Sequence, residues 1–203
     1  MHNIIVASKN RGKISEIRTI LSLPGVAISD LYDIGYTDEI TETGETFEEN
    51  ALIKARHASR ATGLPALGDD SGLVVEALDG QPGVRSARYA GAGASDAANN
   101  RKLLQALAGF PSDRREACFY CAMALVRHAE DPAPLLATGS WRGRILEEPL
   151  GDGGFGYDPL FWVAEEGCTS AQLSPERKNR LSHRGQALAA LLRLVESELE
   201  GTG

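Results

Sequence analysis

Four separated groups of polar residues carry the chemistry that this sequence could perform. The first is Ser8-Lys9-Asn10-Arg11-Gly12-Lys13, which follows a short apolar run and precedes apolar residues at helical spacing. A cationic turn that opens a helix suits anion binding, because its side-chain cations and the helix N-terminal amides converge on one point. The turn lacks the G-x-x-x-x-G-K-[ST] pattern of a P-loop. It predicts a phosphate site, and an ordinary strand-to-helix turn with solvated cations is the alternative.

The second group is acidic. Two adjacent carboxylates lie in Gly68-Asp69-Asp70-Ser71-Gly72, bracketed by glycines and flanked by apolar segments. Either carboxylate could hold Mg²⁺ or orient a water molecule, and adjacent like charges call for a cation. Upstream, helix capping and the helix dipole explain Glu48 and Glu49, whereas Glu42 has no such local explanation. The pattern predicts Glu42 as a second metal ligand, and a solvent-exposed turn is the alternative for the aspartates.

The third and fourth groups lie in the last quarter of the chain. In 151–159, glycines allow a close approach of the backbone to a ligand, Phe155 and Tyr157 could offer flat faces to a base, and Asp158 could accept hydrogen bonds. In 178–185, Lys, His and Arg could donate to carbonyl or phosphate oxygens. The alternative for 151–159 is a flexible hairpin with buried aromatic rings. The alternative for 178–185 is a set of surface side chains at the start of a helix.

Alternating helices and strands must position these groups. We expect a capping box at Thr46-x-x-Glu49 to begin a helix that Gly63 ends. Ser95 and Ser174-Pro175 predict two more helix starts. Strands are expected at 3–7, 26–31, 65–67, 73–78, 117–126, 135–146 and about 160–163, with a first helix at 12–23 and a last helix carrying Leu188, Leu191, Leu192, Val195 and Leu199. The pattern predicts an α/β protein with a mixed β-sheet flanked by helices.

Composition narrows the class of partner. The 203 residues carry a net charge of −7, which argues against a nucleic acid polymer as the main partner and suits a small anionic ligand. No apolar run approaches the ~20 residues of a membrane helix, and the N-terminus lacks the pattern of a signal peptide. We therefore expect a cytoplasmic protein. Cys118 and Cys121 fall in a strand-like run, so we interpret them as core residues and not as a metal or disulfide pair.

Taken together, these groups resemble the inosine triphosphate pyrophosphatase family, which hydrolyses deaminated purine nucleoside triphosphates. The matching segments occur in order across nearly the whole chain. They are Ser8-Lys9-Asn10-Arg11-Gly12-Lys13, Thr46-Phe47-Glu48-Glu49-Asn50-Ala51, Asp69-Asp70-Ser71-Gly72-Leu73, Ser86-Ala87-Arg88-Tyr89, Gly154-Phe155-Gly156-Tyr157-Asp158-Pro159 and Ser182-His183-Arg184-Gly185. One departure is Ser8-Lys9, where the family usually has Thr-Gly.

The resemblance implies one nucleoside triphosphate pyrophosphatase domain over 1–203, elongated and with two lobes around a central cleft. It also implies a homodimer, Mg²⁺ dependence, and cleavage of ITP, dITP or XTP to the monophosphate and pyrophosphate. Carried over by position, the site has four parts. They are phosphate contacts from Ser8, Lys9, Asn10, Arg11, Gly12 and Lys13; metal ligation by Glu42 and Asp70; a substrate contact from Ser71; and a base pocket from Phe155, Gly156, Tyr157, Asp158, Lys178, His183 and Arg184.

Within this site, Asp70 is the expected proton acceptor, and whether it acts mainly as base or as metal ligand stays open. Cleavage between the α- and β-phosphates needs a water in line with the leaving pyrophosphate, so the work is positioning and charge neutralisation. Two other readings use the same residues: a nucleotide-binding sensor without hydrolysis, and a phosphatase with Asp69 or Asp70 as nucleophile. The phosphorus-containing product distinguishes the three hypotheses: a pyrophosphatase releases pyrophosphate, a phosphatase releases orthophosphate and a sensor releases neither.

Overall fold

The computed structural model describes residues 2–21, 26–36, 38 and 40–201. Its strands form one seven-stranded sheet in the order β2-β1-β3-β4-β5-β6-β7. The strands are β1 His2–Val6, β2 Val26–Asp30, β3 Ala66–Val75, β4 Glu116–Val126, β5 Leu135–Ile145, β6 Phe161–Val163 and β7 Cys168–Thr169, and the α-helices are α1 Arg11–Ile20, α2 Phe47–Thr62, α3 Asp96–Ala106, α4 Pro175–Leu181 and α5 His183–Gly201. The predicted class, an α/β protein with a mixed sheet flanked by helices, is confirmed.

The chain divides into two compact units. Unit 1 comprises residues 1–70, 121–139 and 183–203, and unit 2 comprises residues 71–120 and 140–182. Strands β3, β4 and β5 each contribute residues to both units. The polar groups singled out in the sequence are therefore divided between the units.

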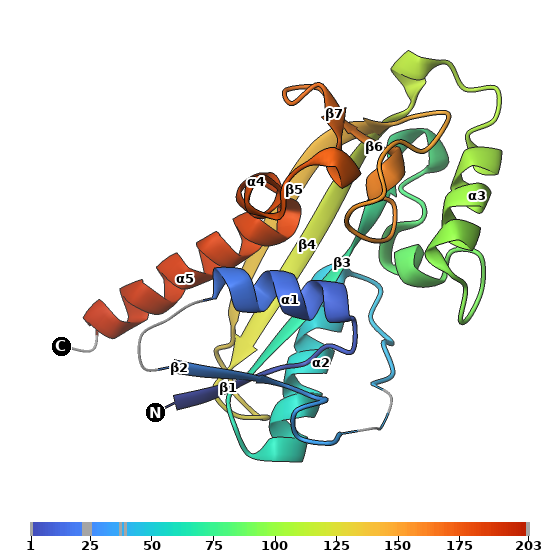
Figure 1. The fold of residues 1–203 in the computed structure, drawn as a ribbon. Coiled ribbons are helices and arrows are strands. Elements are labelled where there is room, and N and C mark those ends of the chain that lie inside the picture. The colour runs from blue at the N-terminus through green and yellow to red at the C-terminus, as the bar shows by residue number, and fades with distance from the viewer. Residues whose placement is uncertain (1, 22–25, 37, 39, 202–203) are drawn as a thin grey trace. The chain divides into compact units, whose positions relative to one another are not determined.

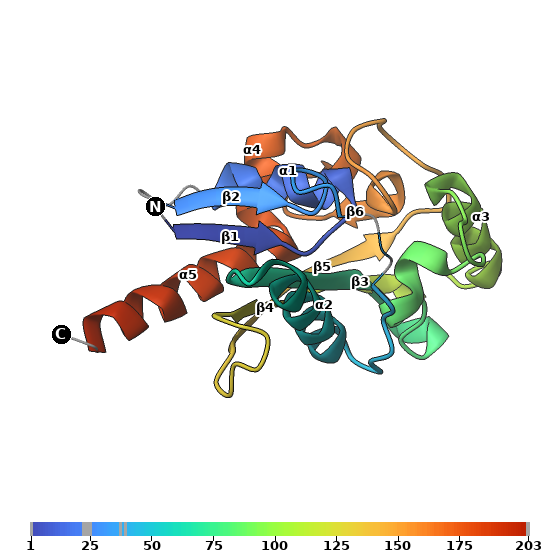
Figure 2. The same ribbon diagram turned by 90° about the horizontal axis from the view of Figure 1, so that it is seen from below.

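In unit 1, β1 pairs in parallel with β2 on one side and with β3 on the other (Figures 1 and 2). Helix α1 packs against α5 (Figure 1). Their apolar stripes meet in a core cluster with strand residues; its buried members include Ile14, Ile17, Leu67, Cys121, Met123, Leu188 and Leu191. The burial of Cys121 in this cluster confirms its interpretation as a core residue.

Helix α2 begins at the predicted capping box. The Thr46 hydroxyl accepts a hydrogen bond from the Glu49 amide, and the Glu49 carboxylate accepts one from the Thr46 amide. Gly63 ends the helix with φ +69°, the left-handed conformation that favours glycine at this position. The helix lies so close to β3 that a Cβ on Gly68 would stand 2.0 Å from the Ala51 carbonyl oxygen. Glycine at position 68 therefore sets the approach of α2 to the strand.

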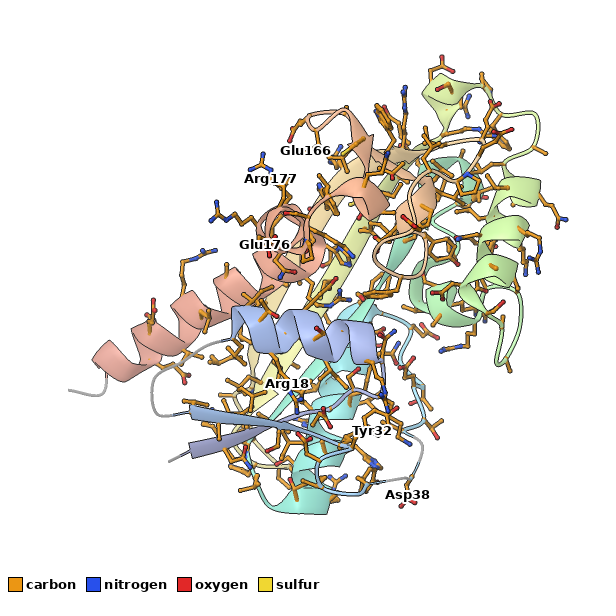
Figure 3. All side chains as sticks on the ribbon, viewed as in Figure 1. Arg18, Tyr32, Asp38, Glu166, Glu176 and Arg177 are labelled. Carbon is orange, nitrogen blue, oxygen red and sulfur yellow. The ribbon has the colours of Figure 1, made fainter. Side chains whose placement is uncertain are left out.

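Unit 2 has its own apolar core. The rings of Phe119, Trp141 and Phe161 pack together, with 4.4 Å between the ring centroids of Phe119 and Phe161. Strand β6 pairs antiparallel with β5 and with β7. Ser174 caps α4 as predicted, and Arg177 in its first turn pairs with Glu166, whose labelled side chains lie near each other in Figure 3.

Three expectations need correction. The segment expected as two short strands around an acidic loop is one continuous strand, β3, so Asp69 and Asp70 are strand residues. Each carboxylate has a cation beside it within the strand, Lys13 for Asp69 and Lys54 for Asp70. Residues 183–185 open α5 instead of preceding it. Helix α1 runs from Arg11 to Ile20, and its expected stop at Pro24-Gly25 falls outside the described residues.

Within the described part of the chain, no helix combines the length and the apolar character needed to cross a membrane.

Candidate active site

The cationic turn lies in unit 1 between β1 and α1. Asn10 is the N-cap of α1: its side-chain oxygen accepts from the Lys13 amide at 3.1 Å, and the Ser8 hydroxyl accepts from the Asn10 amide at 3.2 Å. The Tyr32 hydroxyl donates to the Lys9 carbonyl at 2.8 Å. The Arg11 guanidinium lies over the Tyr32 ring, 5.5 Å from its centroid (Tyr32 is labelled in Figure 3). The turn is thus fixed by its own side chains, with its cations at the start of a helix.

The two aspartates of β3 do not form a carboxylate pair. Successive residues of a strand point to opposite faces of the sheet. Accordingly, Asp69 contacts Lys13 of α1 and Arg184 of α5, whereas Asp70 contacts Lys54 of α2. The strand conformation therefore relieves the repulsion expected from adjacent charges by giving each carboxylate its own cation.

Lys54 connects the two acids predicted as metal ligands. Its Nζ atom lies 2.8 Å from Asp70 Oδ1 and 2.8 Å from Glu42 Oε1. Only 9% of the Lys54 side chain and 7% of the Asp70 side chain are exposed, against 24% for Glu42. The three side chains form a nearly buried acid–lysine–acid bridge, which we call the Lys54 bridge.

Burial and charge act in opposite directions on this bridge. Burial has the largest influence on Asp70 and raises the pKa of its carboxyl, although Lys54 and Lys13 act to lower it. Burial lowers the pKa of Lys54, but the carboxylates of Asp70, Asp69 and Glu42 outweigh it, so the net shift of that pKa is upward. The Lys54 ammonium stays charged, and Asp70 accepts a proton more readily than an exposed aspartate does.

The donor set of the bridge fits a magnesium ion. Oδ2 of Asp70 is buried, and none of the described side chains hydrogen-bonds to it. Mg²⁺ is usually held by one or two carboxylates together with substrate phosphates and waters. Glu42 and Asp70 supply two carboxylates, and the described residues contain no group of three or more His, Cys, Asp or Glu side chains that could hold a metal. Such a site needs substrate oxygens to complete its ligands.

The Asp69 side of the strand holds a separate buried charge cluster. Asp69 Oδ1 lies 2.9 Å from Lys13 Nζ, and Asp69 Oδ2 lies 3.3 Å from Arg184 Nε. Arg184 also pairs with Glu16 of α1, and the Cys121 thiol donates to Asp69 Oδ2 at 3.5 Å. Burial would raise the pKa of Asp69, but Lys13 and Arg184 outweigh it and hold that pKa well below its usual range. Burial, and next the charge of Asp69, raise the pKa of Cys121.

In unit 2, Asp158 organises the predicted base pocket. Its carboxylate accepts from the Phe155 amide at 2.8 Å, from the Ser170 hydroxyl at 2.8 Å and from the Lys178 ammonium at 2.6 Å. The Lys178 ammonium also lies 4.9 Å from the centroid of the Phe155 ring. Gly154 has φ +73°, and a Cβ there would stand 2.1 Å from Asp158 Oδ2. The glycine therefore leaves room for the carboxylate that holds the group together.

The other residues predicted to contact the substrate differ in their burial and in their hydrogen-bond partners. Tyr157 belongs to the core of unit 2, and its hydroxyl donates to the Ser86 carbonyl at 2.8 Å. The Gly156 amide donates to Asp96 Oδ2 at 2.7 Å. Ser71 is half-buried in β3, and His183 is buried as the first residue of α5. Phe155, which is half-buried, is the ring of this segment that lies nearer the surface.

Sequence reasoning missed Lys54 and Ser170. Lys54 had a visible signal, because it interrupts the apolar face of α2 formed by Phe47, Ala51, Ala55 and Ala58. A lysine at a core-facing position requires a buried partner, here two carboxylates. Ser170 gave no such signal, since a lone serine in a loop is ordinary.

The fold and these polar groups define the class: a mixed-sheet α/β protein with a cationic turn before α1 and buried acid–cation pairs on strand β3. Residues 4–194 match the model of the Ham1 family, and the chain belongs to that family.

Its relatives cover nearly its full length. It is 55% identical over 191 residues to a protein of Xanthomonas oryzae (94% of this chain, 96% of the relative) and 51% identical over 192 residues to one of Escherichia coli K12 (95% and 97%), both named dITP/XTP pyrophosphatase. The solved structure of a HAM1 protein from Coxiella burnetii aligns with a TM-score of 0.88 at 47% identity, covering 97% of this chain and 100% of that one.

Proposed function

We propose that this protein hydrolyses non-standard purine nucleoside triphosphates, namely ITP, dITP and XTP, to the monophosphate and pyrophosphate. Relatives about half identical over almost the whole chain carry the name of this activity. The observation that carries the proposal is the Lys54 bridge, which keeps the Asp70 carboxylate nearly buried with one oxygen unpartnered among the described residues. A carboxylate held in this way suits a base that accepts a proton from an attacking water.

The chain's own residues divide the work. Ser8 to Lys13 bind the phosphates with helix N-terminal amides and cations, and Lys13 offsets the charge that grows on the leaving pyrophosphate. Asp70 orients the attacking water and accepts its proton. Glu42 and Asp70 would hold Mg²⁺, which when bound supplies charge neutralisation at the phosphate oxygens and acidifies a bound water.

Base selection is assigned to the group held by Asp158. The hypoxanthine and xanthine rings present a 6-oxo acceptor, whereas adenine presents a 6-amino donor. The Lys178 ammonium directs one of its three N–H donors to Asp158 and can direct another to the 6-oxo acceptor. The 6-amino group of adenine would meet it as donor against donor, a mismatch that discriminates by about 10⁴ in suitable sites. Phe155 supplies the stacking surface. Arg184, also predicted for this role, is engaged with Asp69 and Glu16, so we assign the 6-oxo contact to Lys178.

The remaining parts of the proposal are a homodimer, a cytoplasmic location, and Mg²⁺ as the cofactor. The resemblance supports the homodimer and Mg²⁺, and the two-carboxylate donor set also supports Mg²⁺. The sequence pattern supports the cytoplasmic location.

The test combines a substrate panel with one substitution. Purified protein is incubated with ITP, dITP, XTP, ATP or GTP, and the phosphorus product is identified. We expect pyrophosphate from the first three, loss of turnover when EDTA removes the metal, and a fall in kcat of about 10³-fold or more for Asp70→Asn. Asp113→Asn, an exposed acid in 112–114, is the matched control and should keep wild-type kcat. Orthophosphate as product, or wild-type kcat in Asp70→Asn, would overturn the proposal.

A further inference from the structure

We propose that Asp69 is a positioning residue that holds the Lys13 ammonium in place for the triphosphate. The role given to Lys13 rests on the proposed function. The ion pair itself is a property of the structure: Lys13 Nζ lies 2.9 Å from an Asp69 carboxylate whose side chain is fully buried.

Asp69 is separated from the acid assigned to catalysis although it is adjacent in sequence. It faces α1 and α5, and its partners are Lys13, Arg184 and Cys121. Asp70 faces α2 and pairs with Lys54. The direct contact of Asp69 with the cationic turn is therefore Lys13, and only its charge acts on Lys54 of the bridge.

A buried carboxylate beneath a phosphate site would repel the substrate unless its charge were balanced. Arg184 supplies that balance, with only 2% of its side chain exposed, and Glu16 in turn pairs with Arg184. Lys13 and Arg184 contribute two positive charges, and Asp69 and Glu16 contribute two negative charges. The cluster is neutral overall, and Lys13 is its cation with the more exposed side chain, at 14%.

This arrangement gives Lys13 a fixed ammonium at the start of α1. A lysine side chain loses several rotatable degrees of freedom when it is held in one geometry. Asp69 imposes that loss during folding, so the transition state, in which Lys13 faces the growing charge of the leaving group, does not have to impose it. Asp69→Asn keeps the size of the side chain but removes the charge that holds Lys13, and it leaves the cluster with one net positive charge.

Nuclear magnetic resonance of lysine side chains tests the pairing directly. The chain has five lysines, so ¹⁵N-lysine labelling gives few signals, and Lys13→Arg assigns the Lys13 signal by its loss. We expect a slowly exchanging Lys13 ammonium in the wild-type protein, which disappears in Asp69→Asn while the buried Lys54 signal remains. A wild-type Lys13 ammonium that exchanges as fast as free lysine would overturn the proposal, and this outcome does not depend on the folding of Asp69→Asn. Persistence of the Lys13 signal in Asp69→Asn would also overturn it.

Kinetics give the functional readout. In Asp69→Asn we expect kcat to fall about tenfold or more, because Lys13 is no longer held against the leaving group, while KM for dITP does not rise. Glu16→Gln, which removes the acid that contacts Arg184 and not Lys13, should lower kcat by less. Wild-type kcat in Asp69→Asn, or a higher KM at unchanged kcat, contradicts the proposal. If the wild-type protein releases no pyrophosphate, the proposed function fails, and the resonance experiment still decides the pairing.

Discussion

At the scale of single residues, Lys54 determines the state of the acids around it. Its ammonium pairs with both Glu42 and Asp70. Without it, these two carboxylates would lose the cation that lies between them. Burial raises the pKa of Asp70, and Lys54 is the largest influence that acts to lower it. Lys54 therefore controls the pH range in which Asp70 can act as a base.

We predict that Lys54→Met moves the acidic limb of the pH profile of kcat/KM to higher pH. The proposed mechanism requires ionised Asp70, so the activity should be lost as the pH falls through the pKa of that carboxyl. Removing the ammonium raises this pKa further, and the loss then begins at a higher pH. Arg60→Met, which removes an exposed cation from the same helix, is the control and should leave the limb in place. An unchanged limb in Lys54→Met would separate Lys54 from the ionisation of Asp70.

At the scale of elements, α2 and β3 position the candidate base. Lys54 projects from α2 and Asp70 from β3, and the contact of the two elements at Gly68 brings these side chains within 2.8 Å. The distance between α2 and β3 therefore sets the contact between Lys54 and Asp70. This short distance is possible because residue 68 is a glycine and has no side chain.

Gly68→Ala should lower the free energy of unfolding by about 3 kcal/mol, because the added methyl group meets backbone atoms that cannot move aside cheaply. Gly63→Ala is a matched control: it adds a methyl group in open space at φ +69° and should cost only about 1 kcal/mol of backbone strain. Urea denaturation measures both. Equal costs at the two positions would show that α2 does not need close contact with β3.

The elements also show what the sequence could and could not predict. Helix α2 was predictable because Thr46, Glu49 and Gly63 are local signals that act within one helix. Strand β3 was misread because glycines and aspartates usually mark turns, and the cations that stabilise them here come from distant segments, α1, α2 and α5. The candidate site residues were predicted from their types and spacing and from the resemblance to a family, whereas the partners of Lys54 and the separation of Asp69 from Asp70 required the structure.

At the scale of the whole molecule, the predicted contacts to substrate are divided between two units. Unit 1 contains the cationic turn 8–13, Glu42 and Asp70, and unit 2 contains the segment 154–158 and Lys178. If each unit binds a different part of the nucleotide, a substrate fragment such as pyrophosphate should slow amide exchange in one unit and not in the other.

Hydrogen exchange with inorganic pyrophosphate tests this division. We predict that saturating pyrophosphate with Mg²⁺ slows amide exchange at 8–13, where helix N-terminal amides bind the anion, and leaves 154–158 unchanged. The same measurement on Lys13→Ala should show weaker protection at a given pyrophosphate concentration. Protection of 154–158 alone would show that unit 2, and not unit 1, binds the phosphates, which contradicts the prediction.

In the proposed reaction, water attacks the α-phosphorus and pyrophosphate is the leaving group, and hydrolysis of dITP in ¹⁸O-labelled water tests this step. We expect one ¹⁸O atom to enter deoxyinosine monophosphate and the released pyrophosphate to be unlabelled, as read by mass spectrometry. Label in the pyrophosphate, or release of labelled orthophosphate, would contradict it.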